Sequence, residues 1–292
     1  MKKLGPGYLY LLATLVLWST YEAVSKTLVG LIDPFQVNFI RFLVGGLIMF
    51  GVLAFRRDLG IGRRDLAVAG LAGLLNVGLS MGLIQMSLNV AGARASVTAV
   101  IFSSNPIFVT ACAVLAGEER VRPATVAGLA LGLAGALVIF LEKGGPASSD
   151  LSSPLLALAS AASFGLYTVV GRKTSIRIGS LKMNAYSFVI GSLALLPLLL
   201  LSGVKPFEFD PAALARVGYL AVFTTGLAYL SYFHGLSKTS ASTGSLVFFG
   251  KPVLASLVAA LFLGESLSFN LAAGTLLILS GIAAALYWDR PR

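Results

Sequence analysis

Residues 241–265 read ASTGSLVFFGKPVLASLVAALFLGE, an apolar stretch long enough to cross a lipid bilayer. Lys251 stands near its middle and is followed directly by Pro252. A lysine at the centre of a membrane span costs about 2.5–3.5 kcal/mol on insertion scales, so it needs a buried partner or a function. Pro252 removes a backbone donor at the same point and weakens the helix there. The stretch therefore predicts an interrupted transmembrane helix with a charged centre.

The same pattern occurs in the first half of the chain, where residues 95–117 read ASVTAVIFSSNPIFVTACAVLAG. Phe102 and Pro106 lie 146 positions before Phe248 and Pro252, and this offset is half of the 292-residue chain. Other matches at the same offset are Trp18 with Phe164, Tyr21 with Tyr167, Asn38 with Asn184, Phe42 with Phe188, and Gly135 with Gly281. One shared offset for so many polar, aromatic and glycine positions indicates an internal repeat.

The composition is that of an integral membrane protein. Hydrophobic residues make up 57% of the chain and charged residues 12%, whereas a soluble domain has about 25% charged residues. The net charge of +10 does not indicate nucleic-acid binding, because the basic residues lie in short gaps between apolar runs and not along one amphipathic face. We therefore expect the lipid bilayer, and no nucleic acid, as a partner.

Ten apolar runs of about 20 residues are candidate transmembrane helices. They cover residues 7–28, 34–54, 66–87, 94–116, 122–141, 152–171, 181–201, 213–235, 241–263 and 268–288. With the N-terminus in the cytoplasm, fifteen lysines and arginines fall on the cytoplasmic side and five on the opposite side. This asymmetry predicts that both termini are cytoplasmic.

The predicted fold is all-α, with ten transmembrane helices arranged as two inverted five-helix repeats. The repeats are residues 1–146 and residues 147–292. Because five is an odd number of spans, the second repeat enters the membrane from the opposite face, as in many secondary transporters.

The chain resembles the ten-helix, EamA-like branch of the drug/metabolite transporter superfamily. The resemblance covers essentially the whole chain and rests on WSTYEAVSK (18–26), NFIRF (38–42), the two long stretches quoted above and the glycine-rich spans after each. It implies a carrier with a central cavity, in a family whose members export amino acids or other metabolites or exchange sugar phosphates. In the exporter branch the position before the second proline is often acidic or neutral, and here it is Lys251.

Lys251 and Glu22 are the first candidates for a substrate site. Glu22 is the only carboxylate well inside a span, and its estimated depth differs from that of Lys251 by about four residues, or roughly 6 Å. Glu22 is predicted either to form a structural ion pair with Arg41 or Lys251 or to couple transport to protons. Lys251 is predicted either to pair with Glu22 or to bind an anionic group of the substrate. Arg41 lies nearer the end of the second span, within snorkelling reach of the interface, and a structural role is favoured for it.

Polar and aromatic side chains in other spans are further candidates. Buried polar groups of this kind either bind substrate or form ordinary hydrogen bonds between helices, and aromatic side chains either line a cavity or pack. The candidates are Tyr21, Asn76, Asn105, Tyr167, Tyr229 and Phe248, with Pro106 and Pro252 as helix breaks. Gly128, Gly132, Gly274 and Gly281 predict close helix contacts, within the chain or across a dimer face.

No signature of an enzyme, cofactor site or metal site is present. The sequence has no G-x-x-x-x-G-K-[ST] motif, one histidine and one cysteine, so an ATP-driven pump, a metal centre and a disulfide framework have no support. We expect a secondary transporter of the inner (plasma) membrane, monomeric or homodimeric, that exports small metabolites such as amino acids by alternating access. The alternatives are an organic-anion or sugar-phosphate exchanger and a lipid-handling membrane protein without transport activity.

Overall fold

The structure is a computed structural model that describes residues 6–93, 95–120, 122–142, 151–254, 257 and 269–288. Within these residues every regular element is a helix, which confirms the all-α prediction. The elements are α1 (Pro6–Trp18), α2 (Tyr21–Lys26), α3 (Pro34–Phe55), α4 (Arg63–Gly73), η1 (Leu74–Ser80), α5 (Met81–Asn89), α6 (Ala95–Phe102), α7 (Asn105–Leu115), α8 (Pro123–Glu142), α9 (Ser152–Ile178), α10 (Ser180–Leu201), η2 (Pro211–Ala213), α11 (Leu214–Tyr219), η3 (Leu220–Leu227), α12 (Ala228–Leu236), α13 (Ala241–Ser245), η4 (Leu246–Gly250) and α15 (Phe269–Trp288).

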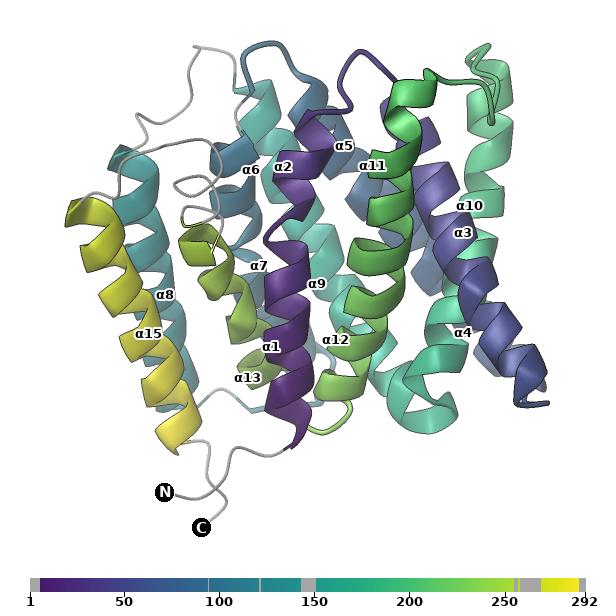
Figure 1. The fold of residues 1–292 in the computed structure, drawn as a ribbon. Helices are drawn as coiled ribbons and strands as arrows, with labels where there is room; N and C mark the ends of the chain where they lie inside the picture. The colour runs from purple at the N-terminus through teal and green to yellow at the C-terminus, as the bar shows by residue number, and fades with distance from the viewer. Residues whose placement is uncertain are drawn as a thin grey trace.

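These helices stand side by side in one bundle (Figure 1). Six continuous helical segments among the described residues are long and apolar enough to cross a membrane, and two shorter helices are also apolar. Their length and composition make the chain a multi-pass membrane protein. Helical residues also occur in each of the ten apolar runs of the sequence, although most of the ninth run beyond residue 254 lies outside the described residues.

Several of the helical segments are interrupted near their middle. They are numbered here by the apolar run of the sequence in which they lie, from the first to the tenth. The first breaks at Ser19 and Thr20, between α1 and α2, as Figure 1 shows, and the fourth breaks between α6 and α7, with Pro106 in the first turn of α7. The ninth segment changes to a 3-10 helix, η4, just before Lys251. The third and eighth segments contain the π-helices η1 and η3, which begin 146 residues apart.

Ion pairs tie the connections together at one end of the bundle. Arg177 pairs with Asp65, Lys182 Nζ lies 2.7 Å from Asp58 Oδ1, and Lys173 Nζ lies 3.1 Å from Glu118 Oε1. These residues lie in or next to the terminal turns of α3, α4, α7, α9 and α10, so these ends of the five helices share one side. The first turn of α1 and the end of α12 meet there as well, because a Cβ on Gly7 would touch Lys238 and Gly235.

The opposite end is held by hydrogen bonds between other connections. Lys26 Nζ donates to the carbonyl of Leu88 at 2.8 Å, and Gln36 Nε2 donates to the carbonyls of Lys205 and Glu208 at 2.9 Å. At this end α3 begins with a side-chain cap, because Asp33 accepts from the amides of Phe35 and Gln36 while Pro34 occupies the first turn. α3 therefore runs from this end to the other, and the segment formed by α4, η1 and α5 runs back.

The glycines of α8 and α15 allow these two helices to pack closely at one edge of the bundle (Figure 1). A Cβ on Gly135 would lie 2.5 Å from the Gly274 carbonyl oxygen, and one on Gly281 would lie 2.8 Å from the Gly128 carbonyl oxygen. Gly132 instead accommodates the ring of Phe249. The glycine spacing seen in the sequence thus serves packing within the chain.

Candidate functional site

The interrupted helices meet around a buried ion pair. Glu22 lies in the first turn of α2, directly after the break in the first segment, and Lys251 directly follows η4. A helix that restarts inside a bundle points its free amide groups toward the break, which favours a carboxylate at its first turn. The breaks therefore place two charged side chains inside the bundle.

The pair itself is short and hidden from solvent. Lys251 Nζ lies 2.6 Å from Glu22 Oε1, and each side chain is 3% exposed. Lys251 Nζ also lies 5.1 Å from the ring centroid of Phe102 and 6.0 Å from that of Phe248, within cation–π range. Glu22 Oε2 has no hydrogen-bond partner among the described residues, so the carboxylate retains an unused acceptor.

A small cavity of about 20 Å³ adjoins this pair. Residues from both halves of the chain line it: Trp18, Tyr21, Arg41, Met81, Ile84, Phe102, Phe164, Tyr229, Phe248 and Lys251. A volume of roughly 10–15 Å³ accommodates one water molecule, so the central cavity has no room for a metabolite in this conformation. Binding a larger molecule requires the surrounding helices to separate.

Arg41 lines this cavity, so the expectation that its side chain reaches the membrane interface was wrong. Its side chain is 1% exposed, and its guanidinium carbon lies 4.7 Å from the ring centroid of Tyr21 and 4.3 Å from that of Phe42. The Nε atom donates to Asn38 Oδ1 at 3.0 Å. The depth of a residue in a span can be counted from sequence, but the face of the helix on which it lies cannot.

The structure brings some of the other predicted residues to the cavity and leaves others in its surroundings. Tyr21, Tyr229 and Phe248 line it, and Tyr229 Oη lies 3.4 Å from Asn76 Oδ1 in η1. Tyr167 lies outside the lining and packs edge-on against Phe233, and Asn105 Nδ2 donates to the carbonyl of Ala161 at 3.0 Å. These last two contacts are those of helix packing.

Sequence reasoning did not include Trp18 and Phe164 among the site residues. Both line the cavity, and their rings meet edge-on with centroids 5.8 Å apart. Trp18 Nε1 also donates to the carbonyl of Thr224 at 2.8 Å. The sequence did contain an indication that these two residues belong to the site, because they occupy equivalent positions in the 146-residue repeat.

Comparison with known proteins identifies the family. The sequence profile of the EamA-like transporter family matches residues 5–141 and, a second time, residues 151–287. This chain belongs to the EamA-like transporter family. An uncharacterized transporter of Clostridium kluyveri is 34% identical over 295 residues, covering 96% of this chain and 92% of the relative.

More distant relatives agree with this assignment. The uncharacterized transporter YvbV of Bacillus subtilis is 31% identical over 278 residues, covering 93% of this chain and 89% of the relative. A solved crystal structure superimposes with a TM-score of 0.76 at 24% identity, covering 97% of this chain and 99% of the other, and this likeness concerns the fold. The resemblance seen in the sequence is confirmed, and the chain is a member of a family of membrane transporters.

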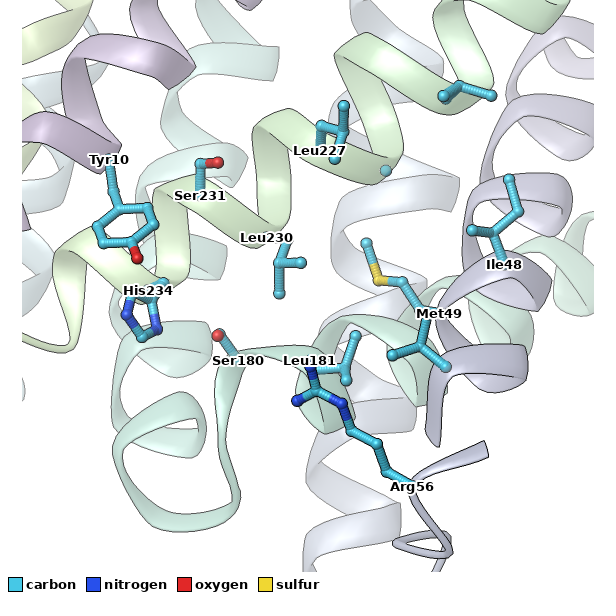
Figure 2. A pocket seen from close by; sticks show the side chains of 13 residues that line it. Tyr10, Ile48, Met49, Arg56, Ser180, Leu181, Leu227, Leu230, Ser231 and His234 are labelled. Carbon is cyan, nitrogen blue, oxygen red and sulfur yellow. The ribbon is translucent and has the colours of Figure 1, made fainter. Parts of the chain in front are cut away.

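A second, larger pocket of this EamA-like bundle, here named the side pocket, is drawn in Figure 2. It has a volume of about 470 Å³ and lies between α3, the start of α10, and η3 with α12. Figure 2 shows Ile48, Met49, Leu227 and Leu230 along the pocket, with Ser180 and Arg56 below Leu230 and His234 beside Tyr10. His234 contacts the ring of Tyr10 at 4.4 Å between centroids, as expected of a histidine near the end of a span.

Proposed function

We propose that this protein is a secondary carrier that moves small metabolites, amino acids first among them, across the inner membrane by alternating access. The observation that carries the proposal is the Glu22–Lys251 pair, which joins the first and ninth segments at the centre of the bundle. Ionisable residues inside a membrane bundle commonly mark a transport pathway, because their burial is otherwise unfavourable. A substrate with charged groups can exchange with such a pair when the helices part.

The internal repeat supports ten spans in two inverted halves, residues 1–146 and 147–292. The family profile matches each half once. The π-helices η1 and η3 begin at equivalent positions, and the break between α6 and α7 ends at Ser104, which is equivalent to Gly250 at the end of η4. Carriers built from inverted repeats place their substrate site at the interface of the two halves, where discontinuous helices meet.

The charge distribution supports cytoplasmic termini. The end of the bundle where α1 begins also carries four basic residues near the end of α9 and the start of α10. They are Arg172, Lys173, Arg177 and Lys182, and they pair with Glu118, Asp65 and Asp58. Basic connections remain on the cytoplasmic side of a membrane. Export as the direction of transport rests on the family resemblance described for the sequence.

The direct test is transport by the purified protein in sealed liposomes. A panel of labelled amino acids and other small metabolites is offered with and without a pH gradient. We expect uptake or exchange of at least one member, lost in the Glu22→Gln/Lys251→Met double variant and retained in the peripheral variant Lys205→Met. Equal transport by the double variant would overturn the proposed site.

Proton coupling through Glu22 is tested in the same liposomes. Glu22→Gln removes the exchangeable proton but keeps a side chain of similar size. If Glu22 couples transport to protons, this variant loses the response to a pH gradient while exchange of substrate for substrate continues. A preserved response assigns Glu22 a purely electrostatic role beside Lys251.

The side pocket favours a second candidate function, the handling of lipid. Its wall is largely apolar and Arg56 lies at one end, an arrangement that suits an acyl chain and an anionic headgroup. Phospholipid exchange between the leaflets of the same liposomes distinguishes the two functions. Lipid exchange that stops on Arg56→Gln, together with no transport of any metabolite, would favour lipid handling.

A further inference from the structure

Arg41 is a buried cation whose charge no carboxylate neutralises in the part of the chain that the structure describes. Its only polar contacts there are Nε to Asn38 Oδ1 at 3.0 Å and Nη1 to Thr225 Oγ1 at 3.4 Å. Nη2 has no hydrogen-bond acceptor among the described residues. An arginine carries five donors in a planar fork, so this side chain retains unused donors inside the bundle.

Glu22 does not supply the missing charge. Its Oε1 atom is bound to Lys251, while no ion pair joins Glu22 to Arg41. Arg41 and Lys251 both line the central cavity, and Glu22 is the only carboxylate that contacts a cation there among the described residues. Among the described residues the cavity therefore holds one positive charge that no carboxylate balances, and this charge is buried away from bulk water.

The geometry of the guanidinium favours a carboxylate as the missing anion. The rings of Tyr21 and Phe42 lie against it and hold its plane. The fork of an arginine matches a carboxylate with two parallel hydrogen bonds. A single carboxylate balances the one surplus charge, whereas a phosphate dianion would exceed it.

We propose that Arg41 binds the carboxylate of the transported molecule, which makes this EamA-like protein a carrier of small organic acids, amino acids included. The inference rests on the proposed carrier function and narrows its substrate class. Lys251 and Glu22 then select among acids: Glu22 Oε2, which has no partner among the described residues, accepts from the ammonium of an amino acid. The aromatic wall contributed by Trp18, Phe164 and Phe248 accommodates an apolar substituent.

The test compares acids with molecules that differ only at the charged groups. The first series is phenylalanine, phenylalaninamide, phenethylamine and hydrocinnamate, and the second is alanine, alaninamide, ethylamine and propionate. Ligand-induced thermal stabilisation of the full chain in detergent reports binding, and liposome uptake reports transport. We expect the acids of at least one series to stabilise and be transported, while the matched amides and amines do neither.

Two variants assign this preference to Arg41. Arg41→Gln keeps hydrogen-bonding groups but removes the charge, and we expect acids to bind about tenfold more weakly or worse, with no preference over the amides. Arg41→Lys keeps the charge without the fork, so the preference survives with reduced affinity. Arg216→Gln is the matched control, because Arg216 is exposed and contacts only the carbonyl of Thr27 among the described residues.

A purely structural Arg41 gives a different result. In that case Arg41→Gln lowers the unfolding temperature without ligand but keeps the preference for acids, and the inference is overturned. If Arg41→Gln does not fold, Arg41→Lys decides, and an unchanged affinity for acids in that variant overturns it as well. Acids and amides bound equally by the wild type, or no acid bound in either series, would also overturn it.

The outcomes separate this inference from the carrier function on which it rests. Binding of acids without any transport leaves the role of Arg41 intact and contradicts the carrier. Transport of amides as fast as acids supports the carrier and contradicts the role of Arg41.

Discussion

Lys251 and Glu22 lie 229 positions apart in the sequence, yet their side chains meet at 2.6 Å in the interior of the bundle. One residue follows the 3-10 helix of the ninth segment and the other follows the break in the first. The pair thus ties the two halves of the chain at the depth where their helices are interrupted. Any motion that opens the cavity at this point has to rearrange it.

The first prediction concerns the stability of this pair. Lys251→Met leaves the carboxylate of Glu22 buried without a partner, and removing one member of a buried pair costs about 3–5 kcal/mol of unfolding free energy. Adding Glu22→Gln removes the stranded charge, so the double variant should recover most of this loss. Thermal unfolding of the detergent-purified variants measures both changes.

Lys205→Met is the matched control. Its partner Glu208 lies at 2.6 Å as well, but both side chains are 69% exposed, and exposed pairs contribute about 0–1 kcal/mol. If Lys251→Met proved as harmless as Lys205→Met, the buried pair would not contribute to the stability of the bundle.

The helices and the pairing of Glu22 with Lys251 could be predicted from sequence, because the length of an apolar run and the depth of a residue in it are counted directly along the chain. The apolar runs gave the helices, and the similar depths of Glu22 and Lys251 gave the hypothesis of their pairing. The depth of a residue does not tell on which side of the helix it lies. For that reason the side chain of Arg41 was expected to reach the interface, although it faces the cavity. An even distribution of apolar residues around a membrane helix hides its inward face.

The break at Ser19 and Thr20 also escaped prediction. It contains no proline, and the hydroxyl groups of both residues donate to carbonyls of the preceding turn, those of Leu15 and Leu17. Serine and threonine make such bonds in uninterrupted helices too, so the sequence alone does not distinguish the two cases. The π-helices η1 and η3 likewise have no sequence signal that separates them from ordinary helix.

The second prediction tests the contact of α8 with α15. In Gly135→Ala the new methyl group would lie 2.5 Å from the Gly274 carbonyl oxygen, which belongs to rigid backbone. The two helices must move apart, at a cost of roughly 1–3 kcal/mol. Gly51→Ala in α3 is the control, since nothing lies within 4 Å of its Cβ and alanine there should be neutral or stabilising. Thermal unfolding separates the two, and equal midpoints would contradict the close packing.

The third prediction fixes the orientation of the chain in the membrane. In a Cys112→Ala background, Gly60→Cys marks the end where α1 begins and Lys205→Cys marks the opposite end. In intact cells a membrane-impermeant thiol reagent should label Lys205→Cys at once and Gly60→Cys only after permeabilisation. The reverse pattern would place the termini outside and refute the orientation inferred from the basic residues.

The last prediction concerns Glu119, which joins the two halves of the chain at the end where α1 begins. Glu119 Oε1 accepts from the amide of Ala241 at 2.5 Å and Oε2 from the amide of Ser242 at 3.2 Å. Glu118 beside it pairs with Lys173 of α9, so the end of α7 is fastened to both α13 and α9. Because α7 and α13 are in contact at this end, we expect an opening of the cavity toward it to require the two helices to separate.

Glu119→Ala should therefore favour a conformation open to this end. Hydrogen bonds to a charged group contribute about 1.5–3 kcal/mol, so their loss should shift the equilibrium by roughly tenfold or more. In a Cys112→Ala background, a cysteine at the cavity residue Met81 reports the shift as faster labelling in inside-out vesicles. Glu208→Ala, at the opposite end, should leave this rate unchanged because it does not touch the α7–α13 contact. A labelling rate that Glu119→Ala does not raise would show that the carboxylate holds the start of α13 without restraining the opening of the cavity.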